Sequence, residues 1–139
     1  RSGTFQEAQD ALLQLVDQEP LLRHRALTGL ALLAVRIGQY DAALGHLERA
    51  LEAFPDDPYA LYLRGRALRQ LGQFAAAEQA LSLALQQRDD FVHAIADMSA
   101  LLVAKAEVAA GEEQARALVG ARRYADRAVA LAPLPSREL

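Results

Sequence analysis

The fold of this chain is decided by two consecutive segments, HRALTGLALLAVRIGQYDAALGHLERALEAFPDD (residues 24–57) and PYALYLRGRALRQLGQFAAAEQALSLALQQRDDF (residues 58–91). The same features recur in both segments after 34 residues. The matching pairs are Gly38 and Gly72, Tyr40 and Phe74, Ala43 and Ala77, Leu47 and Leu81, and Ala50 and Ala84. A fixed period of about 20–50 residues indicates stacked supersecondary units, each packed against its neighbours.

Each of these segments predicts a pair of helices. Apolar residues recur at helical spacing on both sides of a Gly-Gln-aromatic turn, and glycine suits the left-handed conformation that ends a helix. Asp57 is expected to cap the helix that begins at Pro58, and Asp89-Asp90 to form the next turn and cap. The expected helices cover about 23–37, 40–53, 58–71 and 74–87.

The pattern resembles the tetratricopeptide repeat (TPR) family, and the resemblance covers nearly the whole chain. It implies an all-α fold, a right-handed superhelical α-solenoid of antiparallel helix pairs, in which the first helix of each repeat lines a concave groove. It also implies a scaffold that binds other proteins in this groove. We therefore expect residues 1–139 to form a single TPR domain that is not an enzyme. Small residues are expected where helices approach closely, at Ala43, Ala50, Ala77 and Ala84.

Residues 4–20 match the second half of a repeat, with a spacing of 35 rather than 34 residues. Pro20 matches Pro55, which is expected to end a helix. This leading half-repeat lacks the helix that should precede it, so we interpret the chain as a piece of a longer protein or as one whose start was removed. Its apolar side chains are then expected to be exposed at Phe5, Leu12 or Leu15.

Residues 92–133 match a third repeat with ten extra residues, and Gly111 is the only strong helix breaker before Pro133. Because an antiparallel hairpin stays in register only when both arms grow together, we expect two longer helices over about 92–110 and 112–132. The alternative is a pair of standard helices joined by a ten-residue loop, a length that is uncommon. Residues 134–139 are expected to be a frayed tail. The residues expected near the hairpin tip are Lys105, Glu107, Glu112, Glu113 and Gln114.

The composition argues against several classes of function. A net charge of −3 does not favour nucleic acid as the main partner. No apolar run approaches the roughly 18 residues that a membrane-spanning helix needs. The chain has no Cys, its three His are far apart in sequence, and its glycines form no phosphate-binding loop, so no metal or cofactor is expected. Each His is expected at the surface or in the groove. The compartment stays open between cytoplasm and periplasm.

The resemblance implies which residues face the groove. They are Arg25, Thr28, Leu32 and Arg36 in the first repeat, Tyr59, Tyr62, Arg66 and Arg69 in the second, and His93 and Asp97 in the third. Three of them, Tyr62, Arg66 and Arg69, share one helical face, and Tyr and Arg are enriched at binding hot spots. Since guanidinium groups bind carboxylates well, we expect an extended or helical peptide with acidic character as the partner.

Alternatives to this hypothesis stay open. The groove face could be a solvated surface whose arginines pair with Asp56, Asp57 or Asp90. A family subtype that binds chaperone tails has a Lys and Asn pair on its first groove helix, but the matching residues here are Thr28 and Leu32, and the chain has no Asn. The chain could also be an accessory domain that docks substrates for a larger enzyme, or a module that forms a homo-oligomer through its leading helix.

Overall fold

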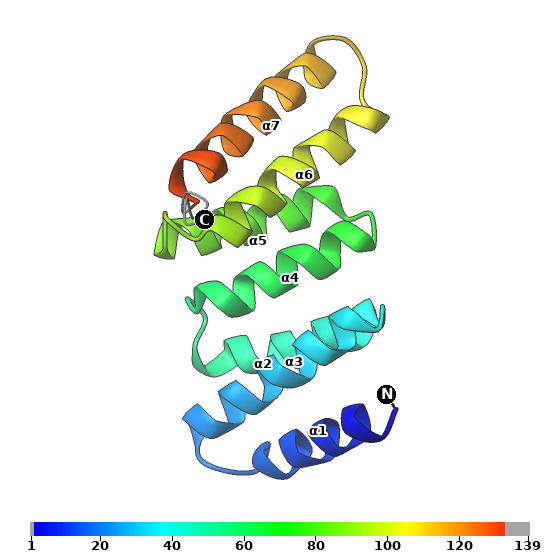
Figure 1. Cartoon of the computed structure of the whole chain (residues 1–139), viewed down its shortest axis with the longest axis vertical. Helices are drawn as coiled ribbons and strands as arrows, with labels where there is room; N and C mark the ends of the chain where they lie inside the picture. Colours follow the sequence, from blue (N-terminus) through cyan, green and yellow to red (C-terminus); the bar gives the residue numbers. More distant parts are fainter. Residues whose placement is uncertain (1, 133–139) are drawn as a thin grey trace, which may run out of the picture.

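The computed structural model describes residues 2–132, and these residues form seven α-helices and no strand. The helices succeed one another along the long axis of the molecule, from α1 at one end to α7 at the other (Figure 1). The all-α fold expected from the sequence is confirmed. Pro133 and the predicted tail at 134–139 lie outside the described residues. The helices are α1 (Ser2–Leu15), α2 (Pro20–Arg36), α3 (Tyr40–Ala53), α4 (Pro58–Gln70), α5 (Phe74–Gln87), α6 (Val92–Val108) and α7 (Gly111–Leu131).

Consecutive helices pair as hairpins, and the hairpins stack on one another. Helix α2 packs against α3, α4 against α5, and α6 against α7. The first helices of neighbouring hairpins also touch, α2 with α4 and α4 with α6. In the described part of the chain, α3 does not touch α5, and α5 does not touch α7. The first helices therefore form the inner layer of a curved stack, which is the arrangement of a solenoid with a concave face.

The two glycine turns that define the repeat have the same geometry. Gly38 and Gly72 have φ angles of 80° and 78°, in the left-handed region that favours glycine. After each glycine, the backbone N–H of the next residue bonds back to the preceding helix, at 2.8 Å in the first hairpin and 2.9 Å in the second. These bonds satisfy a carbonyl at the helix end and reverse the direction of the chain.

Small residues allow the close packing inside and between hairpins. Ala43 and Ala77, which match each other in the repeat, are completely buried, as predicted. The closest approach is at Gly65 on α4, where an added Cβ atom would lie 2.6 Å from Cγ of Leu81 on α5. The large side chains that are fully buried between the helices are Leu27, Leu47, Leu63, Leu81, Ile95, Met98 and Leu101.

The caps predicted for α4 and α6 have different outcomes. Asp57 accepts a hydrogen bond from the backbone N–H of Tyr59 at 3.2 Å, and Pro58 is the first residue of α4, as predicted. Asp89 and Asp90 form a turn, as predicted, but the predicted cap is wrong, because the residue before α6 is Phe91 and no side chain caps this helix.

The connection between α1 and α2 also differs from the prediction. Pro20 is the first residue of α2 and does not end the helix before it. Glu19 accepts a hydrogen bond from the backbone N–H of Leu22 at 3.1 Å and so caps α2. Proline suits this position, since a helix leaves the N–H groups of its first turn without a partner. The leading helix is therefore Ser2–Leu15 rather than 4–20, and α2 has 17 residues where α4 has 13.

The third hairpin is longer than the second, as the sequence predicts. Helices α6 and α7 have 17 and 21 residues, where α4 and α5 have 13 and 14. Only Ala109 and Ala110 join the two long helices, so the alternative of a ten-residue loop is wrong. Lys105 lies in the last turn of α6, near the tip as expected, and its Nζ is 2.7 Å from Oε1 of Glu78 on α5. This ion pair ties the long hairpin to the preceding repeat.

Helix α1 has one neighbour among the described helices, α2. Leu12 is partly buried at this contact, where an added Cβ atom on Gly29 would lie 3.1 Å from its methyl carbons. Leu15 is exposed, as expected for a helix without a second partner, whereas Phe5 is partly buried. The apolar surface left open on α1 is therefore contributed by Leu13 and Leu15.

Candidate binding groove

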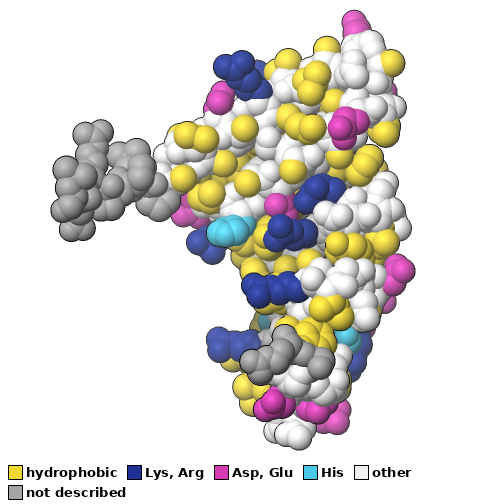
Figure 2. Space-filling view, turned by 45° about the vertical axis from the view of Figure 1, so that its right-hand side comes forward, with side chains coloured by type: hydrophobic (Ala, Val, Ile, Leu, Met, Phe, Trp, Pro, Cys, Tyr) yellow, Lys and Arg dark blue, Asp and Glu magenta, His cyan; other side chains and the backbone are white. Residues whose placement is uncertain are grey.

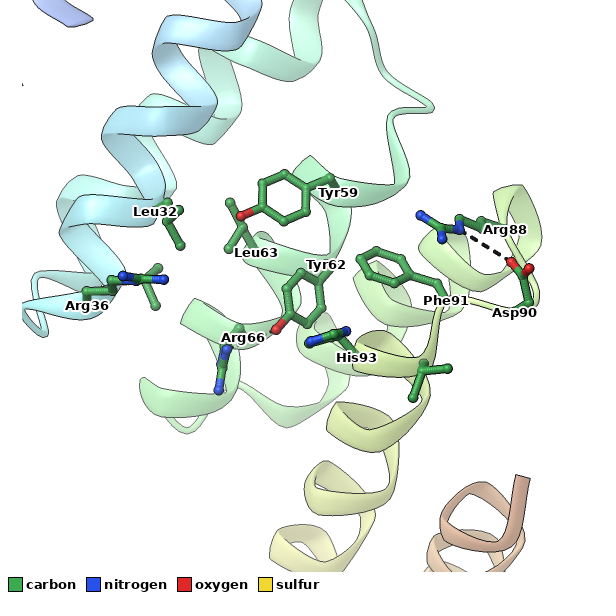
Figure 3. Close-up of a pocket in the computed structure, with 12 residues that line it drawn as sticks. Leu32, Arg36, Tyr59, Tyr62, Leu63, Arg66, Arg88, Asp90, Phe91 and His93 are labelled. Atoms are coloured by element: carbon green, nitrogen blue, oxygen red, sulfur yellow. Dashed lines mark hydrogen bonds and ion pairs between the residues drawn. The ribbon is translucent and has the colours of Figure 1, made fainter. Parts of the chain in front are cut away.

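A pocket of about 680 Å³ opens on the inner layer between α2, α4 and the start of α6 (Figure 3). Its walls are side chains from three helices that the repeat brings side by side, because α4 contacts both α2 and α6. Six of the ten residues predicted for the groove line this pocket, namely Leu32, Arg36, Tyr59, Tyr62, Arg66 and His93.

The floor of the pocket is aromatic. The ring of Tyr62 lies 5.1 Å from that of Phe91 and 6.0 Å from that of Tyr59, measured between ring centroids. The ring of His93 also lies next to that of Tyr62, at 6.3 Å between the centroids. Tyr62 is buried, and burial raises the pKa of its hydroxyl. Rings packed in this way offer a rigid apolar surface with polar groups at its edge.

Arg66 lies between the Tyr62 hydroxyl and Asp97. Its Nη1 donates a hydrogen bond to Oη of Tyr62 at 2.9 Å. Its Nε is 3.6 Å from Oδ2 of Asp97, which is an ion pair but too long for a hydrogen bond. The Asp97 side chain is only 13% exposed. Burial raises the pKa of Asp97 above its ordinary value of 3.8, although Arg66, Arg69 and His93 act in the opposite direction.

The four predicted groove arginines do not pair as the solvated alternative predicts, since none of them forms an ion pair with Asp56, Asp57 or Asp90; Asp90 pairs with Arg88 at the edge of the pocket. The Nε of Arg69 is buried without a hydrogen-bond partner, and within residues 2–132 Arg36 forms no ion pair. Their positive charge is therefore incompletely neutralised. Figure 2 shows Lys and Arg side chains following one another along the middle of the molecule, with apolar side chains between them.

A second pocket of about 560 Å³ lies at the starts of α2 and α4, and it shares Tyr59 with the first. Two more predicted groove residues, Arg25 and Thr28, line it. Thr28 is buried, however, and its hydroxyl donates to the carbonyl of His24 at 2.8 Å, so that hydroxyl is not available as a donor to a ligand. The last two predicted residues, Arg69 and Asp97, lie outside both pockets. The second pocket is lined by Leu21, His24, Arg25, Thr28, Gly29, Phe54, Asp57 and Tyr59.

His24 was expected at the surface or in the groove; it lines the second pocket but is buried, and it holds three helices together. Its Nδ1 lies 2.8 Å from the carbonyl oxygen of Ala50 on α3. Its Nε2 lies 2.6 Å from Oδ2 of Asp57, the cap of α4. The ring also packs against Phe54, at 4.7 Å between centroids. The polar groups around His24 are thus engaged in holding α2 against α3 and the start of α4.

The connection between α5 and α6 supplies pocket residues that sequence reasoning missed. Phe91 is buried beneath the pocket, and Arg88 lies at its edge with Nε 3.3 Å from Oδ1 of Asp90 (Figure 3). The prediction took groove residues from the first helices alone. Phe91 could have been found from the sequence, because it is an aromatic residue directly before a helix whose start faces the groove.

Two other kinds of site are not found in the described part of the chain. Its His, Asp and Glu side chains form no group of three or more that could hold a metal ion. Across residues 2–132, no helix has the length and the apolar run needed to cross a membrane.

The comparison with protein families finds one match inside the repeat. The family model described as "Tetratricopeptide repeat" matches residues 28–91. A comparison with curated proteins gave no significant match.

Solved structures share the fold over a longer part of the chain. A thermophilic TPR protein from Thermus thermophilus matches with a TM-score of 0.72 and 27% identity, over 78% of this chain and 56% of that one. MamA of Desulfovibrio magneticus RS-1, from residue 41 to its end, matches with a TM-score of 0.73 and 20% identity, over 92% of this chain and 68% of that one; this likeness shows the fold alone. This chain therefore spans little more than half the length of the first structure. The matched segment and the shared solenoid fold support the assignment of this chain to the tetratricopeptide repeat family.

Proposed function

We propose that the inner groove binds a segment of a partner protein, extended or helical, that carries acidic side chains. TPR proteins generally mediate protein–protein interaction, and typical members are non-enzymatic scaffolds. The observation that carries the proposal is the first pocket, where the aromatic floor around Tyr62 is bordered by Arg36 and Arg66. This combination of rigid rings and guanidinium groups is typical of residues that dominate binding energy at interfaces.

The charge of the groove is opposite in sign to that of the whole chain. The chain has a net charge of −3, yet three arginines, Arg36, Arg66 and Arg88, line the first pocket with a single carboxylate, that of Asp90. A partner carboxylate placed here would form charge-assisted hydrogen bonds, which contribute about 1.5–3 kcal/mol each. Arg36 and Arg66 are the residues we assign to the acidic side chains, and Tyr59 and Tyr62 to the apolar part of the segment.

Selection from a random peptide library displayed on phage tests this proposal. The purified chain should enrich peptides that contain Asp or Glu, and their affinity is then measured by fluorescence anisotropy. The double variant Arg36→Glu/Arg66→Glu should bind them more than about tenfold more weakly, because two favourable charge contacts become repulsive.

The matched control is Arg64→Glu, which makes the same kind of charge change on α4 at an exposed position outside both groove pockets. Circular dichroism verifies that the variants keep their helices. Equal losses in the control and in the groove variant, or a loss in neither, would contradict the proposal.

A second candidate function is self-association through α1. This candidate is supported by helix α1, which within residues 2–132 packs against α2 alone and leaves Leu13 and Leu15 exposed. Exposed apolar patches on a surface favour contact with another chain. Light scattering at high protein concentration tests it: a mass larger than one chain that reverts in Leu13→Glu/Leu15→Glu supports it, and the mass of a single chain excludes it.

A further inference from the structure

Three exposed apolar side chains converge on the second pocket. Leu21, Phe54 and Tyr59 are 45%, 37% and 39% exposed, and all three line the same cavity of about 560 Å³. They come from different places in the sequence, which are the start of α2, the end of α3 and the start of α4. Single exposed apolar residues are ordinary, whereas several gathered in one concavity indicate a binding site.

The polar groups in the wall of this pocket already have partners. The Asp57 carboxylate is bound through Oδ2 to His24 and through Oδ1 to the backbone N–H of Tyr59. Thr28 donates its hydroxyl proton to a carbonyl inside α2. A polar ligand group would lose its water here and find few partners in exchange, which is unfavourable. The wall therefore favours an apolar group.

Arg25 is the exception among the polar residues of this pocket. It is exposed, and within residues 2–132 it forms no ion pair. Positive charge therefore lies in the second pocket at Arg25 and in the adjoining first pocket at Arg36 and Arg66. Charge complementarity then calls for acidic residues beside the apolar one in the ligand.

We propose that the second pocket holds a bulky apolar side chain, such as that of Leu or Phe, belonging to the same partner segment whose carboxylate lies at the first pocket. This inference rests on the proposed function of the groove. The two pockets share Tyr59, whose ring extends from α4 toward α2 (Figure 3), so one segment that crosses this ring reaches both. The partner is thereby defined as a segment with an apolar anchor flanked by acidic residues.

Two variants on neighbouring residues test the apolar anchor. Leu21→Glu places a carboxylate in the pocket, and Leu22→Glu makes the same change at an exposed residue that does not line it. Both changes lie in the first turn of α2, where an acidic side chain is compatible with the helix dipole. Peptides selected on the wild type should bind Leu22→Glu with nearly unchanged affinity. They should bind Leu21→Glu about tenfold more weakly or worse, since the burial of one apolar side chain is lost.

A double-mutant cycle ties that loss to one side chain of the peptide. Replacing the apolar residue of a selected peptide by Ala should weaken its binding to the wild type by a similar factor, with little further effect on Leu21→Glu. Equal effects of Leu21→Glu and Leu22→Glu would overturn the inference, because the loss would not arise in the pocket.

The outcomes separate this inference from the proposal on which it rests. Peptides that depend on Arg66 but are unaffected by Leu21→Glu would overturn the apolar anchor and leave the acidic groove in place. Peptides that depend on Leu21 but tolerate Arg36→Glu/Arg66→Glu would overturn the acidic preference and leave the anchor. A dimer of the wild type that Leu21→Glu dissociates would overturn the anchor in favour of a second copy of the chain. A wild type that enriches no peptide would overturn both.

Discussion

Helix α4 is enclosed by α2, α3, α5 and α6, whereas helix α1 packs, among the described helices, against α2 alone. Both helices are of ordinary length, 13 and 14 residues, and both carry several leucines. In α4 both Leu61 and Leu63 are buried, while Leu13 and Leu15 of α1 are exposed. The difference lies in the neighbours and not in the helices themselves. In a stack of repeats each helix is stabilised by the elements before and after it, and most helix stability in proteins comes from such packing.

The largest effect that would sharpen this comparison is expected at Leu81, which is completely buried where α5 packs on α4. Leu81→Ala removes buried apolar surface and leaves a cavity, and it should lower the free energy of unfolding by about 2–5 kcal/mol. Leu13→Ala on α1 should change it by less than about 0.5 kcal/mol, because Leu13 is exposed. Urea unfolding followed by circular dichroism measures both. Similar effects of the two changes would break the contrast between the centre of the stack and its end.

A smaller effect is expected from adding a single methyl group to α4. Gly65→Ala would place a Cβ atom 2.6 Å from Cγ of Leu81, and overpacking of this kind costs about 1–3 kcal/mol. Gly45 on α3 is the matched control, since no heavy atom lies within 4 Å of its added Cβ atom. Gly45→Ala should raise stability by about 0.4–1 kcal/mol by restricting the unfolded chain. If Gly65→Ala were also stabilising, the close approach of α4 and α5 would not be as described.

The smallest effect on stability is expected at Asp97 of α6, which pairs with Arg66 of α4. A carboxyl whose pKa is raised in the folded state contributes stability below its unfolded pKa, and this is lost as the pH rises through the folded pKa. Because burial raises the pKa of Asp97, Asp97→Asn should remove a small fall in stability as the pH rises from about 4. Unfolding curves at several pH values measure it, with Asp90→Asn as the control on an exposed aspartate.

Asp97→Asn should also change the affinity of the groove for acidic peptides. Asp97 is the carboxylate that pairs with Arg66, so it competes with a partner carboxylate for that side chain. Asp97→Asn should therefore strengthen the binding of acidic peptides several-fold at neutral pH, by about 1 kcal/mol. The wild type should approach this affinity as the pH falls toward the raised pKa of Asp97. Weaker binding by the variant would mean that Asp97 orients Arg66 for the partner and does not compete with it.

The fold was largely predictable because the repeat is local in sequence. Gly38 and Gly72 reverse the chain by their own backbone preference, and Ala43 and Ala77 permit close packing because of their size. The start of α2 was not predictable in the same way, since a proline between two helices is compatible with the end of one and with the beginning of the next. In this chain Pro20 begins α2, because Glu19 directly before it caps that helix.

The sequence predicted which helical face lines the groove, but it did not predict the hydrogen bonds and packing contacts of the side chains there. Tyr62 and Arg66 follow from helical spacing and do lie together in the first pocket. The burial of His24 depends on Ala50 of α3 and on Asp57, the cap of α4, which are distant in sequence and lie within hydrogen-bond distance of its ring nitrogens. Phe91 lies in the connection between α5 and α6 and packs against Tyr62 in the first pocket. The spacing of residues along a helix does not predict which connection residues line the groove.

The packing of each helix only against near neighbours also has a consequence for how the chain folds. Within the described chain, contacts between helices join elements no more than two positions apart. Contacts that are close in sequence need little loop closure, and proteins rich in them fold within microseconds to milliseconds. Such a stack can nucleate at any repeat and then propagate in both directions. Hydrogen exchange should accordingly be slowest in α4 and α5 and become faster toward α1, so the groove at α4 belongs to the last part of the molecule to open.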